Sequence, residues 1–312
     1  HATVPRSSVS DTDILGDRFR NPTNGALTVT YQVRAQTAAG CISPVRDIVL
    51  TVEPIIRVND PVDVSICSGS ATSITLTSPT VPSSGPVTFN YTAAPSTPGM
   101  LAVTSLTNLP QGHIIQDFPV NNTNVPQTIV YTITPVAIGA KGGAGCISVP
   151  AVEPQTVTIT VEPKPRLTPT RTIQTVCEGS AITGVTLNST TTPSLANAPV
   201  EFEVMSVMDI ATNAPPATVT GFSGVGATFA PGQALADILA NNTSTPQTIR
   251  YTFRPQFAMG LACTGDLVNI DITVTPRPVL ANIPQPADVC SNGQLEINMS
   301  TDTDPLTTLI TW

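Results

Sequence analysis

The chain has 312 residues, of which 40% are hydrophobic, 11% charged and 4% aromatic, with 31 prolines and a net charge of −8. Its 13 cationic residues are spread along the whole length, which excludes the basic surface of a nucleic-acid-binding protein. No apolar run approaches the roughly 18 residues that a membrane span needs. Abundant Thr, Val and Pro favour strands over helices, and the regular apolar alternation argues against disorder.

Three segments of the chain, at 21–35, 121–135 and 241–255, share one sequence pattern. The second reads NNTNVPQTIVYTITP and the third NNTSTPQTIRYTFRP. Each is followed by a cysteine in a loop of small residues, then by an alternating segment that ends in Pro. A further cysteine opens the next repeat, and Cys67, Cys177 and Cys290 are 110 and 113 residues apart. Repetition at this period predicts a tandem array of domains.

The phase of the repeat predicts the domain boundaries. Division after each strand-ending proline gives complete repeats at 55–163 and 164–276. Residues 1–54 match only the C-terminal half of a repeat, and residues 277–312 match only the N-terminal half. We therefore expect this sequence to be a window on a longer array. The joints contain Pro and lack Gly, so we expect short, semi-rigid linkers and a rod of connected units.

Within each repeat, alternation with a period of two predicts short strands. One face of each strand is apolar and the other carries mainly hydroxyl groups, as in a half-buried antiparallel sheet. Several such strands within about 110 residues, separated by Pro, Asn, Gly and Ser, predict an immunoglobulin-like β-sandwich. The clearest expected strands are 87–92, 128–133, 156–161, 200–205, 249–253, 270–274 and 307–312.

One tyrosine recurs at the same place in each repeat, as Tyr31, Tyr131 and Tyr251. A functional interpretation is that the rings stack on sugars. The structural interpretation is a ring that faces the core with its hydroxyl bonded to a nearby backbone group, as in the tyrosine corner of sandwich domains. Tyr131 lies on the same predicted face as Ile129 and Ile133, which favours the structural interpretation.

Residues that could carry out catalysis are few. The two histidines, His1 and His113, have no recognisable nucleophile beside them. The segment GFSGVG at 221–226 has Val225 where a nucleophile elbow requires Gly, which indicates a turn. The glycine-rich loop around Lys141 lacks the pattern of a phosphate-binding loop. We expect a protein that is not an enzyme and that uses no cofactor.

Three pairs of acidic residues could each supply two ligands to calcium. They do not recur in every repeat, as a site built into the domain would, so we interpret them as residues that cap turns and predict no metal site. The pairs are Asp11 and Asp13, Asp60 and Asp63, and Asp302 and Asp304.

The six cysteines lack the short spacings of a zinc site, and one pair per repeat predicts disulfides. In one scheme each complete repeat closes on itself, through Cys67–Cys146 and Cys177–Cys263. In the other, the bonds cross the joints as Cys41–Cys67, Cys146–Cys177 and Cys263–Cys290. The first scheme is favoured, because a domain that folds alone should not depend on its neighbour for its bond. Sequence alone leaves the connectivity open.

The order of these motifs resembles the PKD-like domains of Bacteroidota surface proteins. The resemblance rests on ICSG, an aromatic strand, the NxTxxPQTxxYTxTP block, the GC loop and the strand ending in Pro; the first block departs from it, because GALTV lacks Pro-Gln. Such domains are immunoglobulin-like and form long arrays in giant secreted adhesins, including gliding adhesins of the SprB type. The resemblance implies an extracellular cell-surface protein exported by type IX secretion.

Three functions fit this sequence. The repeats could form a stalk that holds an adhesive tip away from the cell, their faces could bind glycans, or their edges could assemble laterally into a filament. The expected outer faces carry short hydroxyls and few aromatic or Arg anchors, which favours the stalk. The expected partners are neighbouring repeats of the same chain and a surface polysaccharide or substratum.

Overall fold

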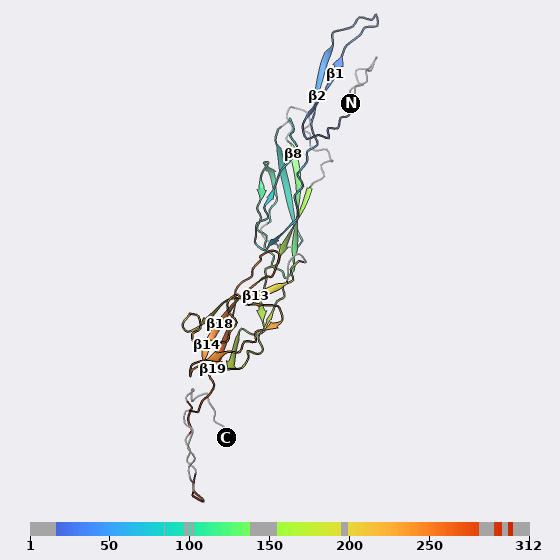
Figure 1. Ribbon diagram of the computed structural model, residues 1–312. Helices are drawn as coiled ribbons and strands as arrows, with labels where there is room; N and C mark the ends of the chain where they lie inside the picture. Colours follow the sequence, from blue (N-terminus) through green and yellow to red (C-terminus); the bar gives the residue numbers. More distant parts are fainter. Residues whose placement is uncertain are drawn as a thin grey trace. The chain divides into compact units, whose positions relative to one another are not determined.

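The computed structural model describes residues 17–83, 85–96, 100, 103–137, 155–194, 199–280, 290–294 and 299–301 (Figure 1). None of these residues is helical, so this part of the chain contains no helix that could cross a membrane. The chain forms two compact units. The first comprises His1–Val64, Gly69–Val120 and Thr128–Thr160, and the second comprises Ser65–Ser68, Asn121–Gln127 and Val161–Trp312. The predicted boundaries at 54, 163 and 276 stay predictions.

The first described strands form an antiparallel hairpin, blue in Figure 1. It consists of β1 (Leu27–Val33) and β2 (Arg46–Val52), with Leu27 opposite Val52 and Val33 opposite Arg46. Alternating Thr and Val favour this extended backbone. The side chain of Val49 is 60% exposed, so the hairpin does not enclose a core of its own.

The first sandwich is built around a five-stranded sheet with the order β3-β9-β8-β5-β6, beside a two-stranded sheet of β4 and β7. In the long central strands every second side chain is buried, as the period-two pattern predicts. Phe89 and Tyr131 are fully buried in this core. The strands are β3 (Val64–Cys67), β4 (Ile74–Thr75), β5 (Val87–Pro95), β6 (Leu106–Leu109), β7 (Ile114–Ile115), β8 (Gln127–Ala137) and β9 (Gln155–Glu162).

The second sandwich repeats this arrangement. Its five-stranded sheet has the order β11-β19-β18-β13-β15, accompanied by the sheets β10-β12-β16 and β14-β17. The strands are β10 (Thr168–Pro169), β11 (Ile173–Cys177), β12 (Thr186–Asn188), β13 (Val200–Asp209), β14 (Val219–Thr220), β15 (Thr228–Phe229), β16 (Gln233–Ala234), β17 (Ala240–Asn241), β18 (Gln247–Phe257) and β19 (Val268–Thr275).

Aromatic side chains fill the core of the second sandwich. Phe202, Tyr251 and Phe253 are fully buried. The rings of Tyr251 and Phe253 stack with centroids 6.0 Å apart, and Phe229 meets Phe253 edge to face at 5.8 Å. The predicted all-β fold, with immunoglobulin-like sandwich domains, is confirmed. The expected strand at 307–312 lies outside the described residues.

Candidate functional site

The recurring tyrosines of the two sandwiches bond to carboxylates. Tyr131 and Tyr251, on β8 and β18, are fully buried. The hydroxyl of Tyr131 donates to Asp117 Oδ2 and that of Tyr251 donates to Asp237 Oδ2, each at 2.7 Å. The predicted backbone partner is therefore wrong. The acceptor is an acidic side chain because the ring ends beside a loop that carries one.

The same contact recurs in the N-terminal hairpin, where Tyr31 donates to Asp17 although its ring is only half-buried. In all three repeats the aspartate precedes the tyrosine by 14 residues. This constant separation was the signal in the sequence that could have revealed the aspartates. It was missed because the residues around them differ from repeat to repeat.

Each sandwich carboxylate also fixes a neighbouring loop. Asp117 accepts hydrogen bonds from the backbone N–H of Thr104 at 2.9 Å and from its hydroxyl at 2.8 Å. Asp237 accepts the equivalent pair from Ser223, at 2.6 and 2.7 Å. Ser223 belongs to the segment 221–226, which is thus a turn anchored by Asp237. We call each aspartate with its Tyr and Ser or Thr partner an Asp–Tyr lock.

Burial raises the pKa of both Tyr131 and Tyr251 well above the ordinary value of 10.0, and the adjacent carboxylates raise it further by disfavouring a phenolate. Both tyrosines therefore remain neutral hydrogen-bond donors.

No histidine among the described residues joins either lock. His113 is the one histidine in this part of the chain, and its backbone carbonyl accepts from Leu76 N at 2.8 Å. The locks hold loops in place.

The Asn-x-Thr part of the repeat is also structural. The Asn121 side chain is 3% exposed, and its Nδ2 donates to the carbonyls of Val125 at 2.8 Å and Val161 at 2.9 Å. Its Oδ1 accepts from the backbone N–H and the hydroxyl of Thr123. Asn21 and Asn241 make the same set of contacts. The turn satisfies backbone carbonyls that would otherwise lack donors.

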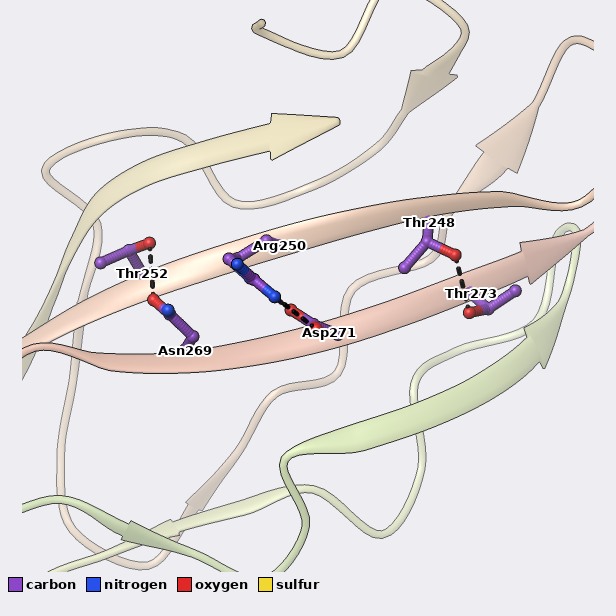
Figure 2. Close-up of polar contacts among 6 residues, drawn as sticks. All are labelled: Thr248, Arg250, Thr252, Asn269, Asp271 and Thr273. Atoms are coloured by element: carbon purple, nitrogen blue, oxygen red, sulfur yellow. Dashed lines mark hydrogen bonds and ion pairs between the residues drawn. The ribbon is translucent and has the colours of Figure 1, made fainter. Parts of the chain in front are cut away.

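The outer face of the second sandwich carries a row of polar side chains. Figure 2 shows three cross-strand pairs on β18 and β19, which we call the polar ladder. The two nitrogens of Arg250 donate to the two oxygens of Asp271 at 2.8 and 2.9 Å, a bidentate pair. The flanking pairs are Thr248 with Thr273 at 2.9 Å and Thr252 with Asn269 at 3.0 Å.

The same face continues onto β13. Arg254 donates to Glu203 at 2.6 Å, and Gln256 donates to Glu201 at 2.9 Å. The large hydrophobic side chains exposed in the described parts of the chain include the aromatics Phe19 and Phe118, and neither lies on this sheet. The face therefore presents hydrogen-bonding groups that already bond to each other, without an aromatic platform for a sugar ring.

Of the three acidic pairs, Asp60 and Asp63 lie among the described residues. Asp63 Oδ1 accepts from the backbone N–H of Thr158 at 2.7 Å, so it bonds to strand β9 and not, as predicted, to a turn of its own. No cluster of three possible metal ligands occurs among the described residues. Asp11, Asp13, Asp302 and Asp304 lie outside the described residues, as do His1 and Lys141.

The described residues contain one disulfide, between Cys67 and Cys263, whose Cα atoms are 5.5 Å apart. Both predicted schemes are wrong for these two residues. Cys41, Cys177 and Cys290 are free and exposed, and Cys146 lies outside the described residues.

Strand register explains why a repeat does not close on itself. Strand β11 runs parallel to β19, with Cys177 opposite Thr275 at the end of β19. Cys263 precedes Val268, where β19 begins. The seven steps along the strand from Val268 to Thr275 separate these ends by about 23 Å. The Cα atoms of a disulfide lie within about 7 Å of each other.

A family model for the PKD-like domain matches residues 64–165 and 210–278, more than half of the chain. The chain belongs to the PKD-like domain family. No curated protein matches the sequence. PKD-like domains have an immunoglobulin-like fold that is typically non-catalytic and occurs in extracellular repeats of the adhesion type.

Solved structures similar to these PKD-like domains include three titin domains, I67–I69, at 12% identity and a TM-score of 0.32, covering 74% of this chain and 69% of that one. The D00–D0 domain of Intimin matches at 15% identity and a TM-score of 0.31, covering 69% and 99%. Human Protocadherin-24 EC1-2 matches at 12% and 0.28, covering 71% and 99%. With TM-scores this low, no property of these proteins carries over.

Proposed function

We propose that these PKD-like repeats are a non-catalytic stalk segment of a large cell-surface adhesin that serves surface attachment or gliding. The observation that carries this proposal is where the recurring residues lie. The side chains that recur from repeat to repeat are those of the Asp–Tyr locks and the Asn-x-Thr turns, which hold each sandwich together.

The charged pair on the exposed face, in contrast, does not recur. Arg250 and Asp271 of the second repeat correspond to Val130 and Thr158 of the first when the Asn-x-Thr blocks and following strands are aligned. A repeated binding function would require the same exposed residues in each unit. A stalk requires only that each unit fold and remain soluble.

The test compares a deletion with a replacement in the full protein on its cell. Removing residues 164–276 in frame should leave the surface fibre assembled but shorter in electron micrographs. Replacing the same residues with a second copy of 55–163 should restore both fibre length and attachment, although the pair Arg250–Asp271 is absent. If the replacement variant had fibres of the original length but did not attach or glide, the stalk proposal would be overturned.

A second candidate is glycan binding by the second repeat, because Arg250 and Asp271 are partly exposed charged groups that the first repeat lacks. The pair Arg250→Ala and Asp271→Ala tests it on a glycan array. The matched control is Arg166→Ala, which leaves the ladder intact. Glycan binding that disappears in the ladder variants and persists in the control would support this candidate.

A further inference from the structure

The disulfide joins two different kinds of cysteine. Cys67 ends the first strand of its repeat, and we call Cys67, Cys177 and Cys290 strand cysteines. Cys263 lies in the loop between the two long strands of the next repeat, and we call Cys41, Cys146 and Cys263 loop cysteines. Cys67 falls within the second compact unit and packs against that unit's core. The bond thus connects the strand cysteine of one sequence repeat with the loop cysteine of the following one.

Cys177 occupies the same local structure as Cys67. Each ends its strand, and each is followed two residues later by a glycine with positive φ, Gly69 at 83° and Gly179 at 74°. The backbone N–H of each glycine donates to a carbonyl in the same place in its repeat, that of Pro119 at 2.8 Å and of Leu239 at 2.9 Å. The two positions differ in that Cys67 is bonded whereas Cys177 is free and exposed.

The register of β11 and β19 places the strand cysteine and the loop cysteine at opposite ends of a repeat. One thiol at each end cannot close a repeat, but it can join successive repeats. We propose that the bond between Cys67 and Cys263 is one rung of a disulfide ladder, in which the strand cysteine of each repeat bonds to the loop cysteine of the repeat that follows it. Cys177 is then the attachment site for the loop cysteine of any repeat placed after residue 276.

The rule accounts for every described cysteine. Between residues 1 and 312, the ladder rule allows a single bond, because only Cys67 and Cys263 are the strand cysteine of one repeat and the loop cysteine of the next. Cys41, Cys177 and Cys290 have no counterpart within this length, and all three are free. The joint-crossing scheme would instead have bonded Cys263 to Cys290.

Each rung forms by two thiol–disulfide exchanges with an oxidised dithiol oxidoreductase or oxidised glutathione. The thiolate of one cysteine attacks the oxidant's disulfide, forming a mixed disulfide and releasing one thiol. The thiolate of the second cysteine then attacks the protein sulfur of that mixed disulfide and releases the second thiol. Two electrons pass to the oxidant, whose disulfide becomes two thiols, and the two cysteines each lose a proton.

A rung changes how the chain carries a pulling force. The bond spans 196 residues, so tension that enters at Cys67 crosses directly to Cys263. At 3.3–3.6 Å per residue, the bypassed segment would add about 650–700 Å of length once unfolded. The ladder would therefore limit the extension of an array under load.

The first experiment pulls the 312-residue chain from its two ends in a force spectrometer. Unfolding of Cys67→Ser should release about 650–700 Å more chain than unfolding of the oxidised wild type. The control Cys41→Ser, which removes a free cysteine, should match the wild type. Reduction of the wild type provides the same comparison without a substitution. Equal released lengths for oxidised and reduced wild type would overturn the proposal.

The second experiment tests the rule on a new pair. A second copy of residues 164–276 is inserted after residue 276, and the disulfides are mapped under non-reducing conditions with free thiols alkylated. The expected linked peptides join Cys67 to Cys263 and Cys177 to the loop cysteine of the inserted copy. In this longer chain Cys177→Ser should leave the copy's loop cysteine alkylated while the first bond persists, which shows that the chain has folded. A linked peptide joining the copy's loop cysteine to the strand cysteine of the same copy would overturn the ladder.

Discussion

The two complete repeats share key interior residues and differ at a charged pair on the exterior. Phe89 and Tyr131 of the first repeat and Phe202 and Tyr251 of the second occupy equivalent positions, and all four are fully buried. The Asp–Tyr locks also match, with equal Tyr–Asp distances. At these recurring positions, packing and the need to pair buried polar groups allow little substitution.

The outer sheet faces keep several threonines but differ at one cross-strand pair, where the constraints are weaker. Where the second repeat has the pair Arg250 and Asp271, the first has Val130 and Thr158. Exposed cross-strand pairs contribute little to stability, so several residue types fit the same position. The comparison teaches that a residue recurs where it is buried or bonds to a buried group, and that an exposed charged pair need not recur.

The largest expected effect is the loss of a buried aromatic ring. Phe89→Ala and Phe202→Ala should each lower the free energy of unfolding by about 3–5 kcal/mol, because each leaves a cavity in a closed core. The measurement is urea unfolding followed by circular dichroism. Phe118→Ala is the control, since that side chain is 52% exposed and its loss should cost about 0.5 kcal/mol or less. Clearly unequal losses at Phe89 and Phe202 would contradict the equivalence of the two interiors.

The second-largest expected effect is the loss of an Asp–Tyr lock, and its size should differ between the two locks. Asp117→Ala removes the acceptor of three hydrogen bonds, those from the Tyr131 hydroxyl and from the backbone N–H and hydroxyl of Thr104, at a cost of about 3 kcal/mol. Asp237→Ala removes the same number of bonds but should cost less, because Asp117 is 4% exposed whereas Asp237 is half-buried and water can replace it.

Urea unfolding measures both variants, with the exposed Asp60→Ala as the control that should unfold like the wild type. If Asp237→Ala proved the more damaging variant, burial would not be what sets the strength of a lock.

Much of the fold could be predicted from the sequence. Alternation of Val157, Ile159 and Val161 with threonines defines a strand with one buried face, and the structure places these three side chains in the core. The repeat pattern also identified the positions of the core tyrosines. Such features depend on neighbours within a few residues, which the sequence displays directly.

Features that depend on distant residues were harder to predict. The bond from Cys67 to Cys263 spans 196 residues and depends on strand β11 running parallel to β19, a pairing that no local pattern reveals. Asp117 and Asp237 are single acidic residues whose partners lie 14 positions away. Their spacing was visible, but its meaning required knowing which loop meets which strand.

At alkaline pH, the tyrosines of both locks should make the stability of the fold depend on pH. Their pKa values are raised in the folded state, so between pH 10 and 12 the unfolded chain loses their protons while the folded chain keeps them. Stability that is fully present below pH 10 should therefore decline as pH rises above it. Urea midpoints at pH 8 and pH 11 measure the decline, which should be shallower in the double variant Tyr131→Phe with Tyr251→Phe. An identical decline in the double variant would show that other groups cause it.

The smallest expected effect concerns the polar ladder, where the repeats differ. The Arg250 side chain is 41% exposed, and although its bond with Asp271 raises the pKa of its guanidinium, solvent screens the attraction. A double-mutant cycle with Arg250→Ala and Asp271→Ala should give a coupling energy well below either core effect, and 1 M salt should abolish it. Transfer of the pair to the first repeat, by Val130→Arg with Thr158→Asp, should leave the unfolding midpoint of that repeat close to its original value. A transfer that destabilised the first repeat as strongly as Phe89→Ala would mean that its outer face is fixed by the fold, and the difference between the two exteriors would then need a structural cause.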